Sequence, residues 1–198
     1  DKGPKFLHYK PYHTLITSLE FDHADIYKDI DHVTLSSKHL VEKVCGSLFV
    51  CGDYKRLVEL ATKSPVPSKT YGLDSKSDFE AKNIHMDSEK TGFDIYHEGK
   101  KLAQITSPLP GKHNVQNVLG AIALITKNRF EHPKIQKALL SFEGVKRRQE
   151  VIGVKNNITV IDDFAHHPTA VKETIEAIKA KYQGQKLWAI FEPRSNSS

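Results

Sequence analysis

The segment from Asp162 to Pro168 gathers two acids and two imidazoles in a single turn. An apolar run at 158–161 precedes it and predicts a short buried strand. Val171, Ile175 and Ile178 follow it at helical spacing. Proline suits the first position of a helix. The pattern therefore predicts a strand, a ligand-binding loop and a helix, in this order.

A second apolar run, Leu187 to Phe191, reads as another strand, so 158–191 predict a βαβ unit with parallel strands and a right-handed crossover. In open parallel sheets, ligands bind beyond the carboxyl ends of the strands. Both ends are polar here, the second over Glu192 to Asn196. Asp163 suits the hydroxyls of a nucleotide ribose, and His166, near the helix N-terminus, suits a phosphate. We expect the two loops to face one crevice.

The segment from Leu19 to Asp25 places three carboxylates and one imidazole just beyond a predicted strand at 14–19. Oxygen ligands suit Mg²⁺, which takes few protein ligands and completes its shell with water and phosphate oxygens. His23 is the imidazole of this group. The alternative is a helix N-terminus, where the acids favour the helix dipole and the histidine is incidental.

The segment from Gly111 to Asn117 opens the most apolar predicted helix of the chain. Asn114 and Asn117 are three residues apart and share a helix face, where their amides suit the edge of a purine. The alternative is that one asparagine caps the helix and the other is exposed. The apolar face of this helix is supplied by Val118, Leu119, Ile122 and Ile125.

Lys146-Arg147-Arg148 is the one tight basic cluster, and it lies in a predicted linker at 144–150. The planar fork of arginine binds phosphate through two hydrogen bonds, and a linker residue can face a ligand held between two domains. The alternative is a solvated run of charge. The chain contains no GxGxxG and no GxxxxGK[ST] motif, so an ATP site would need a phosphate loop from outside it.

Strands and helices alternate along the chain, which predicts an α/β fold. The expected elements are strand-like runs at 6–9 and 14–19, a helix near 33–44, a strand at 47–51, a helix from about 54 to 62, antiparallel strands at 79–86, 93–97 and 101–107, and helices from about 113 to 127 and 133 to 141. Glu98-Gly99-Lys100 is expected to form a hairpin turn. We place a domain boundary near residue 148.

Composition narrows the class of protein. The 198 residues are 38% hydrophobic, enough for a packed core, and no apolar run approaches the roughly 20 residues that span a bilayer. We therefore expect a soluble, cytoplasmic protein with no membrane partner. The charge of +5 is spread along the chain, so nucleic-acid binding is not indicated.

Cys45 and Cys51 are expected to be buried thiols. Both ends of the chain look like those of a piece of a longer protein.

Four motifs, in their order along the chain, resemble the Mur ligase family, whose members are ATP-dependent enzymes that join amino acids or peptides to UDP-linked muramic acid. The four are Leu19 to Asp25, Gly111 to Asn117, Lys146 to Arg148 and Asp162 to Pro168. The resemblance covers essentially the whole chain and is weakest across 52–105. It implies the later part of the family's central ATPase-like domain over 1–148, and the first βαβ of its Rossmann-like C-terminal domain over 149–198. It also places the P-loop and a first magnesium ligand upstream.

The resemblance implies ATP and Mg²⁺ as cofactors and a role for individual residues. The implied set is His23 on the second Mg²⁺, Asn114 and Asn117 on adenine, Arg148 on the nucleotide phosphates, Asp163 on the ribose and His166 on a phosphate. Asp22, Arg194 and the cofactor-binding candidate His113 are secondary candidates. Phosphoryl transfer depends mainly on positioning and charge neutralisation, so Arg148 and His166 are also the expected catalytic residues.

Within the family, three motifs are more similar to the branch that adds the tripeptide L-Ala-γ-D-Glu-meso-diaminopimelate to UDP-N-acetylmuramate in peptidoglycan recycling than to the branch that adds L-alanine. These motifs are Leu19 to Asp25, Asp162 to Thr169 and Glu192 to Asn196. The implied reaction forms an acyl phosphate from the muramic acid carboxylate and ATP, and the amine of the peptide then displaces phosphate. The alternatives are the L-alanine-adding enzyme and a nucleotide-binding fragment that is inactive alone. Several members use a carbamylated lysine after the Asp-His motif; Lys38 lies in that region and is not assigned this role.

Overall fold

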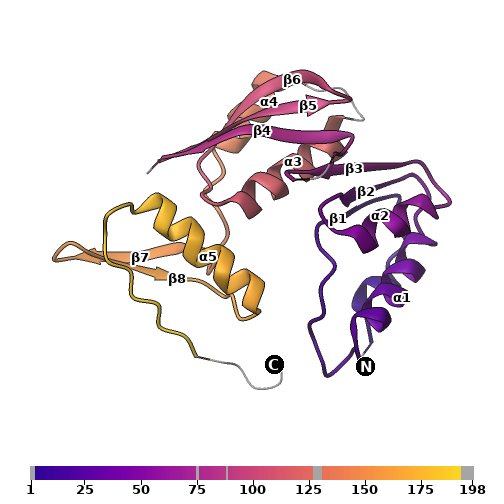
Figure 1. The fold of residues 1–198 in the computed structure, drawn as a ribbon, viewed down its shortest axis with the longest axis horizontal. Helices are drawn as coiled ribbons and strands as arrows, with labels where there is room; N and C mark the ends of the chain where they lie inside the picture. Colours follow the sequence, from indigo (N-terminus) through magenta and orange to yellow (C-terminus); the bar gives the residue numbers. More distant parts are fainter. Residues whose placement is uncertain (1–2, 75, 88, 127–130, 193–198) are drawn as a thin grey trace.

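The protein consists of two parts joined by a short connection, as the computed structural model shows for residues 3–74, 76–87, 89–126 and 131–192 (Figure 1). The larger part is built on a six-stranded sheet whose order follows the sequence, and the smaller part holds a two-stranded sheet. The strands of the large sheet are β1 (His13–Ile16), β2 (Ser47–Cys51), β3 (Ser68–Gly72), β4 (Phe79–Met86), β5 (Thr91–His97) and β6 (Lys100–Ser107). The predicted α/β class is confirmed.

The first four strands pair in parallel, whereas β5 and β6 are antiparallel to their neighbours. All five residues of β2 are buried, which requires cover on both faces of the sheet. The helices of this part are α1 (Ile30–Val41), α2 (Lys55–Thr62), α3 (Lys112–Thr126) and α4 (His132–Leu140). α2 packs on β2 and β3, and α3 crosses the sheet from β1 to β5. The loops that follow β1, β2 and β3 therefore meet at one edge of the sheet.

The start of the chain differs from the prediction. The strand-like run at 6–9 lies in a short 3₁₀ helix, η1 (Lys5–His8), in which the backbone N–H of Leu7 donates to the carbonyl of Pro4 at 3.0 Å. A strand needs a neighbouring strand to satisfy its backbone, and β1 is paired only with β2 in the described sheet. The apolar run therefore satisfies its backbone locally.

The predicted antiparallel strands are present as β4, β5 and β6. Glu98 and Gly99 turn between β5 and β6 with φ angles of 50° and 79°, as expected for a tight hairpin. β3 was not predicted, because its residues, SKTYG, have neither an apolar run nor clear alternation. Its partners on both sides hold it in the sheet, and Tyr71 is fully buried.

The smaller part contains β7 (Glu150–Lys155), β8 (Ile158–Asp162) and α5 (Pro168–Lys181). β8 and α5 lie where the sequence predicts a strand and a helix, and Pro168 takes the first helical position. The prediction missed β7, which pairs antiparallel with β8. Asn156 and Asn157 connect the two strands with φ angles of 51° and 62°, which is the backbone of a two-residue hairpin turn.

The prediction of a second strand at 187–191 is wrong. This segment has no regular secondary structure, and Ile190 is 97% exposed. Within the described residues no strand lies beside it, so an extended backbone there would have no hydrogen-bonding partner. The strand and helix of the expected βαβ unit are therefore present, but the parallel strand pair is not.

The two cysteines differ from each other. Cys51, the last residue of β2, is buried as predicted, whereas Cys45 lies before that strand and is exposed, contrary to the prediction. None of the helices in the described part of the chain has the length and apolar character that crossing a membrane requires.

The close approach of α3 to the sheet gives a test of the fold. A β-carbon added at Gly120 would lie 2.7 Å from the Cζ atom of Tyr71, whose ring is fully buried. We expect Gly120→Ala to lower the free energy of unfolding, because overpacking costs about 1–3 kcal/mol and the helix propensity of alanine returns at most about 1 kcal/mol. Urea unfolding measures this difference.

Gly153→Ala is the matched control, because a β-carbon at Gly153 would have no atom within 4 Å. A Gly120→Ala variant that is as stable as the wild type would show that α3 does not rest on the ring of Tyr71.

Candidate functional site

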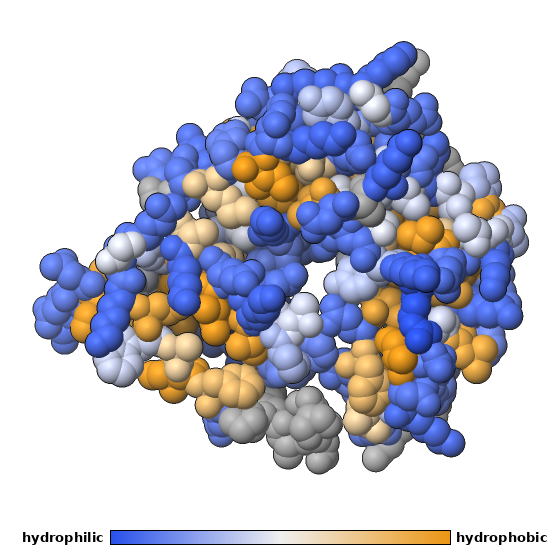
Figure 2. All heavy atoms as spheres, viewed as in Figure 1, coloured by the Kyte–Doolittle hydropathy of each residue, from blue (hydrophilic) through white to orange (hydrophobic). Residues whose placement is uncertain are grey.

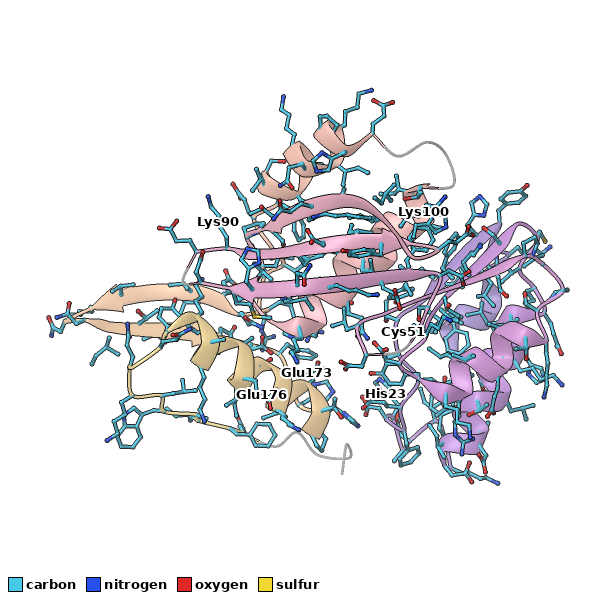
Figure 3. All side chains as sticks on the ribbon, turned by 45° about the horizontal axis from the view of Figure 1, so that its top comes forward. His23, Cys51, Lys90, Lys100, Glu173 and Glu176 are labelled. Atoms are coloured by element: carbon cyan, nitrogen blue, oxygen red, sulfur yellow. The ribbon has the colours of Figure 1, made fainter. Side chains whose placement is uncertain are left out.

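A cavity of about 920 Å³ lies at the edge of the sheet where β1 ends, between the two parts of the protein. Its walls come from the loop after β1, the start of α3, the connection between the two parts, the loop after β8 and the first turns of α5. Figure 2 shows an opening between the two parts, and Figure 3 shows His23 and Glu173 on opposite sides of it. Its position at the carboxyl ends of parallel strands is typical of ligand sites in α/β proteins.

The cavity brings together most of the residues singled out in the sequence. Seven of them line it: Asp22, His23, His113, Asn114, Asn117, Arg148 and Asp163. His166 is not part of the lining, but its Nε2 atom lies 4.0 Å from Oδ2 of Asp22, which does line it. Residues more than 130 positions apart in the sequence therefore meet at one site.

His23 lies at the tip of the loop after β1. Its backbone has a φ of 58°, and its N–H donates to Oδ1 of Asp22 at 2.6 Å. Its Nε2 atom lies 3.9 Å from Oδ2 of the same carboxylate, and the imidazole is 63% exposed. A histidine in this unusual left-handed conformation is held there by its local contacts, which leaves the ring free to turn towards a ligand.

The donors near His23 fit Mg²⁺ with a small set of protein ligands. Within the described residues, no group of three or more histidine, cysteine or acidic side chains is arranged to hold a metal. Asp22 and His23 supply one carboxylate and one imidazole on adjacent positions. Mg²⁺ commonly takes one or two protein groups and completes its octahedral shell with water and phosphate oxygens.

Asn114 and Asn117 lie in the first half of α3 and both line the cavity, as their spacing predicts. The Nδ2 atom of Asn114 donates to the carbonyl of Pro110 at 2.7 Å, which fixes the amide and leaves its oxygen as an acceptor. Asn117 is exposed. The pair therefore combines an anchored amide with one that is open to a ligand.

The connection between the two parts is an ordered turn. Arg147 has a φ of 59°, its backbone N–H donates to Oε2 of Glu150 at 2.7 Å, and its side chain reaches Asp162 at 3.3 Å. The guanidinium groups of Arg147 and Arg148 lie 5.0 and 5.8 Å from the ring centre of Phe164. Of these two arginines, Arg148 is the one that lines the cavity.

Asp163 is anchored by the backbone. Its Oδ2 accepts from the N–H of Gln149 at 2.8 Å, and its Oδ1 accepts from the N–H of Ala165 at 2.7 Å. Each carboxylate oxygen has a further lone pair, so the group keeps acceptors for a ligand hydroxyl. The adjacent Asp162 pairs with Arg147. Both acids of the turn therefore also support its conformation.

His113 is partly buried at the start of α3. Burial lowers the pKa of its imidazole; the charge of Asp163 opposes this, and the charge of Arg148 adds to it. Its Nε2 atom lies 3.3 Å from the side-chain amide nitrogen of Gln149, where an unprotonated nitrogen accepts the hydrogen bond. His113 is therefore a neutral group that joins α3 to the connection.

Sequence reasoning missed several residues of this region. Glu20 accepts hydrogen bonds from Tyr54 and Thr169, and Glu173 lies on the first turns of α5. Burial raises the pKa of Glu173, and the charge of Glu20 contributes to the rise. Glu20 belongs to the acidic motif recognised in the sequence, but its partners are up to 149 positions away, and no local pattern indicates such a pair.

Arg194, a secondary candidate, lies outside the described residues. Lys38 is exposed on α1, and its Nζ atom lies 3.8 Å from Oε1 of Glu42. Lys38 is not among the residues that line the cavity.

Comparisons with known proteins agree with this arrangement. The family model described as Mur ligase middle domain matches residues 5–125, and the one described as Mur ligase, glutamate ligase domain matches residues 147–198. The first match alone covers more than half of the chain. The chain therefore belongs to the Mur ligase family.

Individual relatives support the same conclusion. The chain is 36% identical over 192 residues to UDP-N-acetylmuramate–L-alanine ligase of Pediococcus pentosaceus, which covers 97% of this chain and 43% of that protein. It is 38% identical over 195 residues to the protein of the same name from Clostridium acetobutylicum, with 97% and 42% covered. The chain thus spans about two fifths of the length of these relatives.

Solved structures share the fold. A murein peptide ligase from Psychrobacter arcticus is 34% identical, with a TM-score of 0.66, and the match covers 97% of this chain and 40% of that one. The UDP-N-acetylmuramate–alanine ligase of Thermotoga maritima has a TM-score of 0.78 at 22% identity, with 91% and 41% covered, and it supports the fold alone.

The environment of His113 predicts a dependence of stability on pH. An unfolded histidine takes up a proton as the pH falls below about 6.5, whereas folded His113 resists protonation. Its contribution to stability is therefore present above this pH and is lost as the pH falls towards the lowered pKa. We expect His113→Gln to lose less stability than the wild type between about pH 7 and pH 5, as measured by urea unfolding.

His39→Gln, which removes an exposed imidazole from α1, is the matched control. Equal losses of stability in the wild type and in His113→Gln over this range would show that His113 is not shielded from solvent.

Proposed function

We propose that the chain is part of an ATP-dependent ligase that joins L-Ala-γ-D-Glu-meso-diaminopimelate to UDP-N-acetylmuramate through an acyl phosphate, in peptidoglycan recycling. The observation that carries the proposal is the cavity between the two parts, where α3 contributes amides, the connection contributes Arg148 and the second part contributes Asp163. Membership of the Mur ligase family supplies the reaction class. Since the reaction consumes ATP, we place it in the cytoplasm.

ATP lies in this proposal with its base against α3 and its ribose against the loop after β8. Asn114 and Asn117 bind the adenine edge, with His113 beside them, and Asp163 accepts from the ribose hydroxyls. The anchored carboxylate and amide support these roles, because pre-oriented groups lose little entropy when they bind a ligand. We also propose a domain boundary near residue 148, so that 1–148 and 149–198 each supply one wall.

The phosphate end of the nucleotide lies in the proposal near the loop after β1. His23, with Asp22, holds Mg²⁺ there, while Arg148 and His166 offset the negative charge that moves during phosphoryl transfer. Phosphoryl transfer requires mainly positioning and charge neutralisation, and this set of side chains is suited to both. The chain has no P-loop motif, so this cavity supplies only part of the phosphate contacts.

A second candidate is the ligase that adds L-alanine to UDP-N-acetylmuramate. The observation in its favour is that the curated relatives described above carry this name at 36% and 38% identity. A murein peptide ligase of known structure is 34% identical. These identities are too close to choose between the two amines, so the choice of the tripeptide rests on the resemblance of the three motifs.

A competition assay tests the proposal. The complete ligase is supplied with UDP-N-acetylmuramate, ATP and Mg²⁺, and with L-alanine and the tripeptide at equal concentration. We expect the tripeptide adduct to dominate by at least about tenfold, which corresponds to about 1.4 kcal/mol in the transition state. Mass spectrometry of the UDP-linked products measures both adducts in one reaction.

A dominant L-alanine adduct would replace the proposed function with the second candidate. ATP turnover without either adduct would contradict both. Reactions without ATP, and without UDP-N-acetylmuramate, are the controls for hydrolysis of the nucleotide by other routes.

A further inference from the structure

Glu20 joins the two parts of the protein through a single carboxylate. Its Oε1 accepts a hydrogen bond from the hydroxyl of Tyr54 at 2.9 Å, and its Oε2 accepts one from the hydroxyl of Thr169 at 2.8 Å. Tyr54 directly precedes α2 in the larger part, whereas Thr169 is the second residue of α5 in the smaller part. The side chain of Glu20 is only 30% exposed. The carboxylate is therefore a shared acceptor in the wall of the cavity.

His167 adds a second connection at the same place. Its Nδ1 atom lies 3.4 Å from Oε2 of Glu20, and its Nε2 atom lies 3.2 Å from the carbonyl oxygen of Phe21. Because His167 directly precedes α5, the start of this helix is held against the loop after β1 at two adjacent positions. We call the contacts of Glu20 with Tyr54, Thr169 and His167 the Glu20 link.

The partners of Glu20 are suited to holding it in place. Burial raises the pKa of Tyr54, and the hydrogen bond to Glu20 raises it further, so the phenol stays protonated and donates. Both hydroxyl donors are neutral, so they do not offset the negative charge of the carboxylate. The negative charge of Glu20 also acts on Glu173 in α5, where it contributes to the raised pKa of that carboxyl group.

The Glu20 link lies between residues that belong to opposite sides of the site. Asp22 and His23 lie two and three residues after Glu20 on the loop after β1, and His166 directly precedes His167 on the other side. Oδ2 of Asp22 lies 3.9 Å from Nε2 of His23 and 4.0 Å from Nε2 of His166. Movement of the start of α5 away from Glu20 would therefore separate His166 from Asp22.

We propose that Glu20 is a positioning residue that fixes the loop after β1 against the start of α5, and so sets the distance between the two sides of the cavity at its phosphate end. The inference rests on the proposed function, because it assigns that end to the phosphates. Glu20 acts through Thr169 and His167 and does not itself contact the reacting groups. A side chain that acted on Mg²⁺ or phosphate directly would instead depend on its charge.

Substitutions in the complete ligase separate these two roles. We expect Glu20→Ala and Thr169→Val each to lower kcat by roughly tenfold, because both break the same hydrogen bond between the two parts. The KM for the acceptor amine should change much less. The double variant should be little worse than the poorer single variant, because the two changes remove one interaction. Steady-state kinetics with saturating UDP-N-acetylmuramate measures these quantities.

Glu20→Gln is the conservative substitution that should keep most of the activity lost in Glu20→Ala. Its amide oxygen still accepts from one hydroxyl, and its amide nitrogen donates to the other, because hydroxyl groups also accept. A positioning role therefore predicts a kcat within about threefold of the wild type for Glu20→Gln. If kcat of Glu20→Gln were as low as that of Glu20→Ala, the proposal would be overturned. It would also be overturned if the loss of kcat in the double variant equalled the product of the losses in the two single variants.

Hydrogen exchange tests the link without any ligase activity. In Glu20→Ala and in Thr169→Val, backbone amides of both segments, 17–27 and 164–172, should exchange faster than in the wild type. Unchanged exchange at 164–172 in Glu20→Ala would overturn the link even if catalysis were impaired. If the complete protein forms no ligase product, the proposed function fails, while the exchange result still decides whether Glu20 joins the two parts.

The matched controls make the same chemical changes away from the cavity. Glu42→Ala removes a carboxylate that pairs with Lys38 on α1, and Thr62→Val removes a hydroxyl that donates to the carbonyl of Glu59 within the larger part. Neither residue lines the cavity. We expect both to leave kcat and the exchange of 164–172 at wild-type values.

Discussion

The parallel pairing of β1, β2 and β3 is the constraint from which the site follows. Parallel strands point their carboxyl ends to one edge of the sheet, so the loops that carry Glu20, His23 and Tyr54 emerge side by side. α3 crosses the same sheet, and its close approach to the ring of Tyr71 depends on the missing side chain of Gly120. These contacts bring the start of α3 to the same edge without a long loop.

The smaller part completes the cavity because two sets of hydrogen bonds attach it there, in addition to the packing of α5 against α3. In one, the backbone N–H of Phe164 donates to the carbonyl of Arg147, and that of Gln149 donates to Asp163, so the connection and the loop after β8 form one unit. In the other, Glu20 holds the start of α5. Hydrogen bonds at the wall of the cavity suit a site in which a nucleotide has to enter between two parts and leave again.

Much of the fold was predictable from apolar patterns. β2 and α3 were expected within a residue of their observed bounds, because Leu48, Leu119 and their neighbours form a run and a helical stripe. Patterns failed where partners decide the structure: β3 is polar but paired on both sides, while 187–191 is apolar but unpaired in the described sheets. The residues of the cavity were found from their chemistry and from the family resemblance. The contact between Glu20 and Thr169 was not found, because it depends on how the two parts meet.

The central claim is that the adenine of ATP lies against the start of α3, and photocrosslinking with 8-azido-ATP tests it most directly. The complete ligase is illuminated with this analogue and Mg²⁺, and the labelled peptides are identified by mass spectrometry, with excess ATP as the competitor. We expect labelling within residues 111–117 that excess ATP suppresses. Labelling confined to the turn of the β5–β6 hairpin at 97–100, which does not line the cavity, would contradict this position of the adenine.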